Sequence, residues 1–189
     1  MQGWWVASYA ILWFLVIVLC FVVVSLARQI GTLHLRLGPR GALEIDDEGP
    51  PLGQAPTVAD IVGVDGDTVS VGGPGRAQVL LFVSPTCHVC EQVLPSIGVA
   101  AAAKEMDAIV LSDTDPIETT LAFGSRQLDV PVVAGQDLAI TYGVPGTPYV
   151  VVLDELGIAR AKGTVNNLEQ LEGLLDTAIQ RRAEQRFAS

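Results

Sequence analysis

Apolar residues form one long uninterrupted block near the start of the chain and short runs elsewhere. The block extends from Val6 to Ala27, carries no charge and contains two serines as its only clearly polar residues. A helix of about 22 residues at about 1.5 Å per residue is roughly 33 Å long, close to the hydrocarbon thickness of a bilayer, about 30 Å. Trp4 and Trp5 precede the block, where an interfacial aromatic belt would lie. The pattern predicts a transmembrane anchor within residues 1–36.

A cleaved signal peptide is the alternative reading, because Ser25-Leu26-Ala27 resembles a small-x-small cleavage site. The block is longer than the usual apolar region of a signal, about 7–15 residues, and no Lys or Arg precedes it. A retained anchor is therefore favoured, with residues 28–36 continuing its helix. The basic flank at Arg28, Arg36 and Arg40 favours a cytoplasmic domain, although long domains can override this tendency.

Beyond the anchor, the pattern changes twice. Residues 37–56 are rich in Gly and Pro with an acidic run, which is typical of a linker. Residues 57–189 form the remaining domain and open with apolar alternation around Asp65-Gly66-Asp67, which predicts a hairpin. Short apolar runs predict strands at Val79–Val83, 107–112, 130–135, 149–154 and 157–163. Helices are predicted from near Cys87 and at 115–128, 136–144 and 166–182, with Asp115 and either Asn166 or Asn167 as N-caps.

This order of elements predicts an α/β domain with a mixed sheet and helices on both faces. The chain has a net charge of −10. Binding of nucleic acid requires a basic surface, so the charge argues against a nucleic-acid partner. No cofactor is expected.

The candidate chemistry lies in "SPTCHVCEQVLP", where two residues separate Cys87 from Cys90. A structural zinc site needs four ligands, and Cys20, His34 and His88 are poorly placed to complete one, so no metal is predicted. A purely structural disulfide would close a very small loop and stabilise little. A working dithiol fits the position best, between a strand end and a helix start where partial positive charge favours a thiolate.

The two cysteines would have different roles. Cys87 would form the mixed disulfide with a client protein, either as the attacking thiolate or as the sulfur that is attacked. Cys90, one helical turn later, would attack this mixed disulfide and release the client. A protonated His88 would lower the pKa of Cys87 and make the disulfide more oxidising, although plain solvent exposure of His88 is a competing reading.

The cysteine motif after a buried strand, together with "VPGTPYVVVLD", resembles the thioredoxin superfamily. The resemblance implies a thioredoxin-like fold in which Pro148 is cis and packs against the dithiol. It implies that Thr147, Pro148 and Pro85 contact the substrate. The extra strand and helix expected within residues 115–133 are characteristic of the membrane-tethered, extracytoplasmic branch.

The anchor-proximal "LARQIGTLHLRLGPRGAL" and the cysteine motif narrow the resemblance to the thioredoxin-like proteins of methylamine utilisation. That resemblance implies a single-pass protein of the bacterial inner membrane with a periplasmic domain. The client would be a protein with cysteines, such as the methylamine dehydrogenase small subunit during its maturation. A membrane or periplasmic redox partner would recharge the dithiol.

Two positions depart from ordinary thioredoxins. Leu81 stands where those proteins carry a buried acid, and Thr86 where they carry Trp. The missing acid favours formation or isomerisation of disulfides over reduction. Two alternatives stay open: a general or cytochrome c maturation-type thiol reductase, and a non-catalytic thioredoxin-fold binding module or chaperone. Cys20 is expected to be inert in the anchor.

Overall fold

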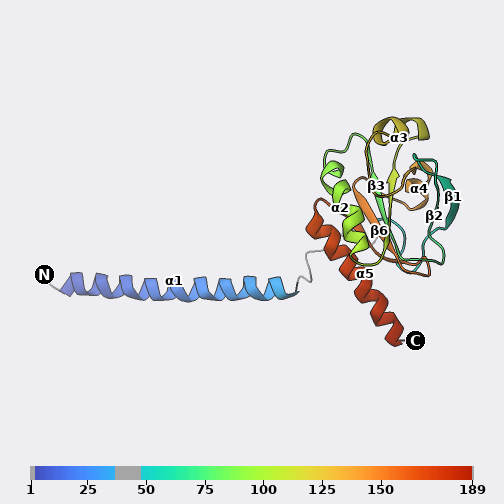
Figure 1. Ribbon diagram of the computed structural model, residues 1–189. Helices are drawn as coiled ribbons and strands as arrows, with labels where there is room; N and C mark the ends of the chain where they lie inside the picture. Colours follow the sequence, from blue (N-terminus) through green and yellow to red (C-terminus); the bar gives the residue numbers. More distant parts are fainter. Residues whose placement is uncertain (1–2, 37–47, 189) are drawn as a thin grey trace. The chain divides into compact units, whose positions relative to one another are not determined.

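The computed structural model describes residues 3–36 and 48–188 (Figure 1). The chain divides into two units, Met1–Pro39 and Arg40–Ser189. The first unit contains helix α1 (Gly3–Arg36), which covers the predicted anchor and its predicted extension as one helix. Within α1, the 21 residues Gly3–Val23 are long and apolar enough to cross a membrane. A membrane anchor and a signal sequence both fit such a helix.

The second unit contains the remaining described elements, in an order that alternates strands and helices. They are β1 (Val58–Val62), β2 (Thr68–Val71), β3 (Gln78–Val83), α2 (Cys90–Ala102), β4 (Asp107–Ser112), α3 (Pro116–Phe123), β5 (Val132–Ala134), α4 (Gln136–Thr141), β6 (Tyr149–Leu153), β7 (Ala159–Thr164) and α5 (Leu168–Ala188). Strands β1 and β2 pair as the predicted antiparallel hairpin. Helix α3 lies within the predicted insertion, and strand β5 begins in it and ends one residue beyond it.

The main sheet has five strands in the order β5-β4-β3-β6-β7. Strand β4 is parallel to β3 and to β5, whereas β6 is antiparallel to β3 and to β7, so the sheet is mixed as predicted. Strand β3 is central and is covered on both faces, which explains why its sequence is continuously apolar rather than alternating.

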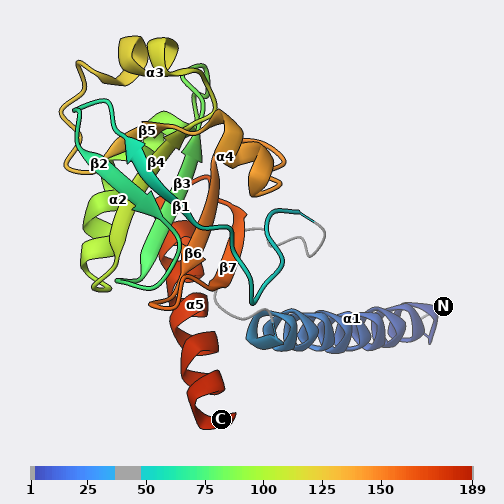
Figure 2. The same cartoon turned by 90° about the vertical axis from the view of Figure 1, so that its right-hand side faces the viewer.

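Alternate side chains of β3 enter two separate hydrophobic clusters. Val79, Leu81 and Val83 pack in a cluster with residues of α2 and α5. Leu80 and Phe82 pack in the second cluster, with residues of α4 and the β1–β2 hairpin. The period of two places these side chains on opposite faces of the sheet. Helices α2 and α5 therefore cover one face, and α4 with the hairpin covers the other (Figures 1 and 2).

The predicted helix caps of α3 and α5 are confirmed. Asp115 Oδ1 accepts hydrogen bonds from the backbone N–H groups of Ile117 and Glu118, at 2.8 and 3.0 Å. Asn167 Oδ1 accepts from the N–H of Gln170 at 2.9 Å and caps α5. Helix α3 is shorter than predicted, since it ends before Gly124, and α5 continues beyond the predicted range.

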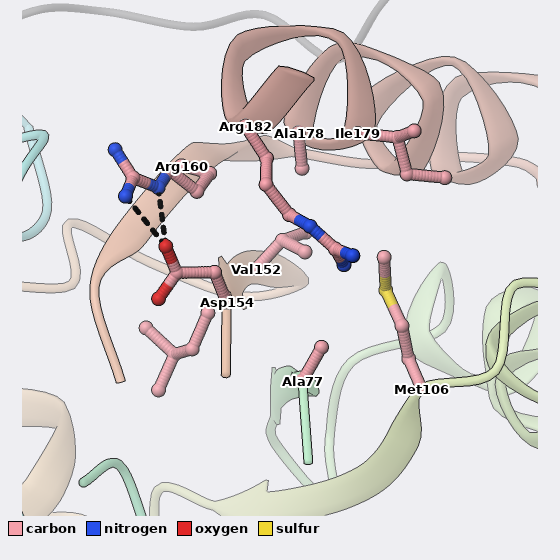
Figure 3. Close-up of a pocket in the computed structure, with 9 residues that line it drawn as sticks. Ala77, Met106, Val152, Asp154, Arg160, Ala178, Ile179 and Arg182 are labelled. Carbon is pink, nitrogen blue, oxygen red and sulfur yellow. Dashed lines mark hydrogen bonds and ion pairs between the residues drawn. The ribbon is translucent and has the colours of Figure 1, made fainter. Parts of the chain in front are cut away.

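A buried ion pair that the sequence pattern did not indicate fixes the β6–β7 turn (Figure 3). Asp154 Oδ2 lies 2.6 Å from Arg160 Nη2, and the two side chains are 4% and 9% exposed. Asp154 Oδ1 also accepts from the N–H groups of Leu156 and Ile158. Arg160 donates in addition to Gln185 of α5. Both charges are thus paired and hydrogen-bonded, as burial requires.

Residues 48–56, here called the entry segment, are hydrogen-bonded to later residues of the second unit. The Tyr149 hydroxyl donates to the carbonyl of Glu48 at 3.0 Å, and the Tyr142 hydroxyl donates to that of Pro56 at 2.7 Å. The predicted linker included this segment, and the linker's other residues, 37–47, lie outside the described residues.

Candidate active site

A tight turn carries the chain from the end of β3 to the first cysteine. The N–H of Cys87 donates to the carbonyl of Ser84 at 3.1 Å, which closes a four-residue turn. Pro85 is the second residue of this turn, a position for which its fixed φ is suited. The turn therefore presents Cys87 just beyond the end of the central strand.

Helix α2 begins at Cys90, so the prediction of a start near Cys87 was wrong by three residues. The backbone of Cys87 is engaged in the turn with Ser84 and does not join the helix. Val89 is the N-cap and offers no side-chain acceptor. Cys87 Sγ supplies an acceptor instead, 3.1 Å from the N–H of Cys90. The sulfur of Cys87 thus lies against the amino end of α2, whose free N–H groups and partial positive charge favour a thiolate.

Cys87 and Cys90 form a disulfide, with their Cα atoms 5.3 Å apart. Cys90 is 1% exposed, whereas Cys87 is partly exposed. A thiol from another protein can therefore approach Cys87, and Cys90 is shielded behind it.

The surroundings of the inner cysteine are apolar. Leu81 is fully buried and belongs to the same cluster as Cys90, together with Val93 and Val150. Among the described residues the buried acidic side chain is Asp154, and its carboxylate is paired with Arg160 in the β6–β7 turn. Asp113, which follows β4, is partly buried: its Oδ1 is enclosed without a hydrogen-bond partner in the described part of the chain, and its N–H donates to the carbonyl of Val83 at 2.9 Å.

The peptide bond between Thr147 and Pro148 is cis, as the resemblance implied. Strand β6 pairs with β3 antiparallel, with Phe82 opposite Tyr149. Extending this register by one residue puts Pro148 opposite Val83, the last residue before the turn that leads to Cys87. Pro148 is buried and Thr147 is partly exposed. Their contact with a substrate stays a prediction, as does that of Pro85.

His88 lies exposed in the turn between the two cysteines. Of the interactions between described residues, none involves its imidazole. That a protonated His88 lowers the pKa of the Cys87 thiol stays a prediction.

The structure adds one residue that sequence reasoning did not single out. Arg126, which follows α3, lies with Nη2 at 3.4 Å from Oε1 of Glu91, the residue after Cys90. Its guanidinium is 5.3 Å from the centre of the Phe123 ring. This pair links the inserted segment to the first turn of α2. Glu91 and Arg126 are 35 positions apart, so only their opposite charges could have suggested the contact.

Within the described residues, no group of three or more His, Cys, Asp or Glu side chains could hold a metal ion. The third cysteine, Cys20, is a free, exposed thiol on α1.

No protein-family model matches the chain. Among solved structures, StoA from Bacillus subtilis matches with a TM-score of 0.54 and 14% identity, over 66% of this chain and 98% of that one. This likeness shows the fold. The five-stranded mixed sheet, the two-residue spacing of the disulfide and the cis-proline before β6 define a thioredoxin-like protein.

Curated relatives identify the family. Methylamine utilization protein MauD from Methylorubrum extorquens is 36% identical over 175 residues, which cover 90% of this chain and 85% of that protein. MauD from Methylobacillus flagellatus is 36% identical over 180 residues, covering 93% and 87%. The chain belongs to the MauD family.

Proposed function

We propose that the chain is a membrane-tethered thiol–disulfide oxidoreductase that forms or rearranges disulfides in a protein client outside the cytoplasm. The observation that carries this proposal is the asymmetry of the disulfide: Cys87 is partly exposed at the end of a strand, and Cys90 is buried behind it.

The asymmetry assigns an order to the exchange steps. A client thiolate attacks Cys87 Sγ, the Cys87–Cys90 bond breaks, and Cys90 leaves as a thiolate that takes up a proton. A second client thiolate then attacks the client sulfur of the mixed disulfide. A disulfide forms in the client, and Cys87 leaves with the electron pair. The dithiol is reduced by two electrons, and a membrane or periplasmic disulfide partner must reoxidise it.

The apolar surroundings of Cys90 support this direction. Running in reverse, as a reductase, the enzyme needs Cys90 to lose its proton before it attacks the mixed disulfide. Leu81 offers no acceptor for that proton, and the cluster around it is apolar. Disulfide formation runs this step in the opposite sense, with Cys90 as the leaving group, and it is favoured because the reduced form keeps Cys87 as a stabilised thiolate. Isomerisation through Cys87 alone does not use the step.

Family membership supports the choice of client and compartment. MauD relatives bear names of methylamine utilization, and we infer that the client is the methylamine dehydrogenase small subunit during its maturation. An oxidising compartment suits disulfide formation, so α1 would act as an anchor that holds the domain in the periplasm.

Trapping of mixed disulfides tests the proposal. In a Cys90→Ser variant, Cys87 should accumulate client proteins in complexes that reducing agent releases. The matched control removes both thiols, Cys87→Ser with Cys90→Ser, and should retain no client covalently. Equal retention by the two variants would show a non-catalytic binding module instead.

A further inference from the structure

Strand β4 is paired along only part of its outer edge. Strand β5 pairs with Val110, Leu111 and Ser112, and the N–H of Val110 donates to the carbonyl of Pro131 at 2.9 Å. Alternate residues of a strand direct their backbone groups to the same neighbour. The N–H and carbonyl of Ala108 therefore also point to the β5 side, below the point where β5 begins.

The chain before β5 does not fill this gap. Pro131 has no N–H with which to reach the carbonyl of Ala108. Val130 packs on helix α2, since a Cβ at Gly98 would lie 2.9 Å from Val130 Cγ1. Between Ala108 and residues 127–131, all of them described, no backbone hydrogen bond is formed. Ala108 is 8% exposed, and buried backbone groups without a partner are rare in folded proteins.

A groove of about 1010 Å³ follows this open edge. We call it the β4 groove. Helix α2 forms one wall with Pro95 and Val99, and β2 contributes Val69. Val99 is 75% exposed, so the groove offers apolar contacts beside the backbone groups of Ala108. Figure 2 shows the hairpin and α2 near β4.

The charges that line the groove are acidic. Asp107 and Asp129 line it, and among the described residues no lysine or arginine does so. Asp107 is paired with Arg76, whose Nη1 lies 2.9 Å from Asp107 Oδ1. Asp129 is exposed and forms no ion pair with another described residue. A basic ligand is favoured over an acidic one.

We infer that the β4 groove binds an extended, basic segment of the protein client by strand addition to Ala108. Main-chain hydrogen bonds to an open sheet edge supply affinity, and the apolar and acidic walls supply selectivity. The inference rests on the proposed function only for the source of the segment. It assigns the protein a client-binding site separate from the dithiol.

A cysteine-free probe tests this site on the full chain in detergent micelles. The probe is the peptide acetyl-Lys-Val-Thr-Val-Lys-amide, and the readout is the amide resonance and hydrogen exchange of Ala108 in alanine-labelled protein. The peptide should shift this resonance saturably and slow its exchange. The same peptide N-methylated at its three central residues should bind at least tenfold more weakly. Equal binding of the two peptides, or no change at Ala108, overturns the inference.

Two lysine variants locate the binding. Val99 and Ile140 are each 75% exposed on a helix, and only Val99 lines the groove. Val99→Lys should weaken the basic peptide at least tenfold by charge repulsion, whereas Ile140→Lys should stay within twofold of wild type. Equal affinities in the two variants overturn the site. In the absence of peptide, the Ala108 amide could become protected from hydrogen exchange as the protein concentration rises. This result would show that a second copy of the chain fills the groove, and it would also overturn the inference.

The variant Cys87→Ser with Cys90→Ser separates this inference from the proposed function. It should bind the probe as wild type does, because the peptide has no thiol. In the wild-type protein, probe binding without thiol exchange with the client would contradict only the proposed function. Exchange without probe binding would contradict only the inference.

Discussion

At the scale of single residues, the two cysteines and Leu81 define what the dithiol can do. Exposure separates Cys87 from Cys90, and the fully buried Leu81 keeps the surroundings of Cys90 apolar. Thiolate formation is favoured at Cys87, beside the amino end of α2, and is unaided at Cys90. The pair is therefore better suited to receiving electrons through Cys87 than to delivering them through Cys90.

His88 provides a test of the charge around the outer cysteine. If a protonated His88 favours the Cys87 thiolate, replacing His88 by Ala should raise the pKa of the Cys87 thiol. His88→Arg should restore a low pKa, which distinguishes charge from shape. The pKa can be followed by the thiolate absorbance of the reduced protein. An unchanged pKa in His88→Ala would contradict a tuning role.

Tyr142 makes a prediction about stability in alkali. Burial raises the pKa of Tyr142 to about 12, so the folded state favours the neutral phenol. The stability that this group contributes is fully present below the unfolded pKa, about 10, and is lost as pH rises through about 12. The loss is on the order of 2 kcal/mol.

The Tyr142→Phe variant isolates this contribution. At pH 7 it should be destabilised by about 1 kcal/mol, because the hydrogen bond to Pro56 is lost. Between pH 10 and 12 its free energy of unfolding should fall less than that of wild type, so the difference between the two should shrink and then change sign. Denaturant unfolding at each pH measures this. If the unfolding free energies of wild type and Tyr142→Phe fell in parallel with pH, this contribution of Tyr142 would be contradicted.

At the scale of elements, the entry segment is held by contacts with the sheet. Gly49 has φ +73°, and a Cβ added to it would collide with the Tyr149 hydroxyl, which donates to Glu48. Gly53 has φ +92°, and a Cβ there would meet nothing within 4 Å. Both glycines have a positive φ, which side-chain-bearing residues rarely adopt, but only at Gly49 would a Cβ meet other atoms.

Substituting alanine at these two glycines measures the collision. Gly53→Ala should cost about 1 kcal/mol of unfolding free energy from the left-handed backbone alone. Gly49→Ala should cost about 1–3 kcal/mol more, because the added methyl group must displace Tyr149. Thermal or denaturant unfolding compares them. Equal losses would show that the Tyr149 contact does not hold the entry segment.

Most elements could be predicted from the sequence because burial governs their patterns. The run Val79–Val83 is apolar because β3 is covered on both faces, and Asp115 marks a helix start through its own cap. The start of α2 was missed because a sulfur, not a usual capping side chain, meets its first N–H. Contacts between distant positions, such as Glu91 with Arg126, leave no periodic signal in either segment.

At the scale of the whole molecule, the chain combines an apolar helix with a thioredoxin-like unit. The basic residues that follow the apolar block favour a cytoplasmic domain, whereas the disulfide function favours an oxidising compartment. Only one of these sides allows the proposed exchange with an extracytoplasmic client.

A topology reporter distinguishes the two orientations. Alkaline phosphatase fused after Ser189 should be active, since it requires disulfide formation outside the cytoplasm. Green fluorescent protein at the same position is the matched control and should be dark when exported unfolded. Fluorescence without phosphatase activity would place the unit in the cytoplasm and contradict the proposed compartment.

The equilibrium potential of the Cys87–Cys90 couple against glutathione tests the central claim most directly. An exchanging couple that forms or rearranges disulfides should lie between about −120 and −180 mV, the range of the known oxidases and isomerases. A value near −270 mV, that of thioredoxin, would contradict the proposed direction of electron flow. A value below about −300 mV would mark a structural disulfide and contradict the working dithiol itself.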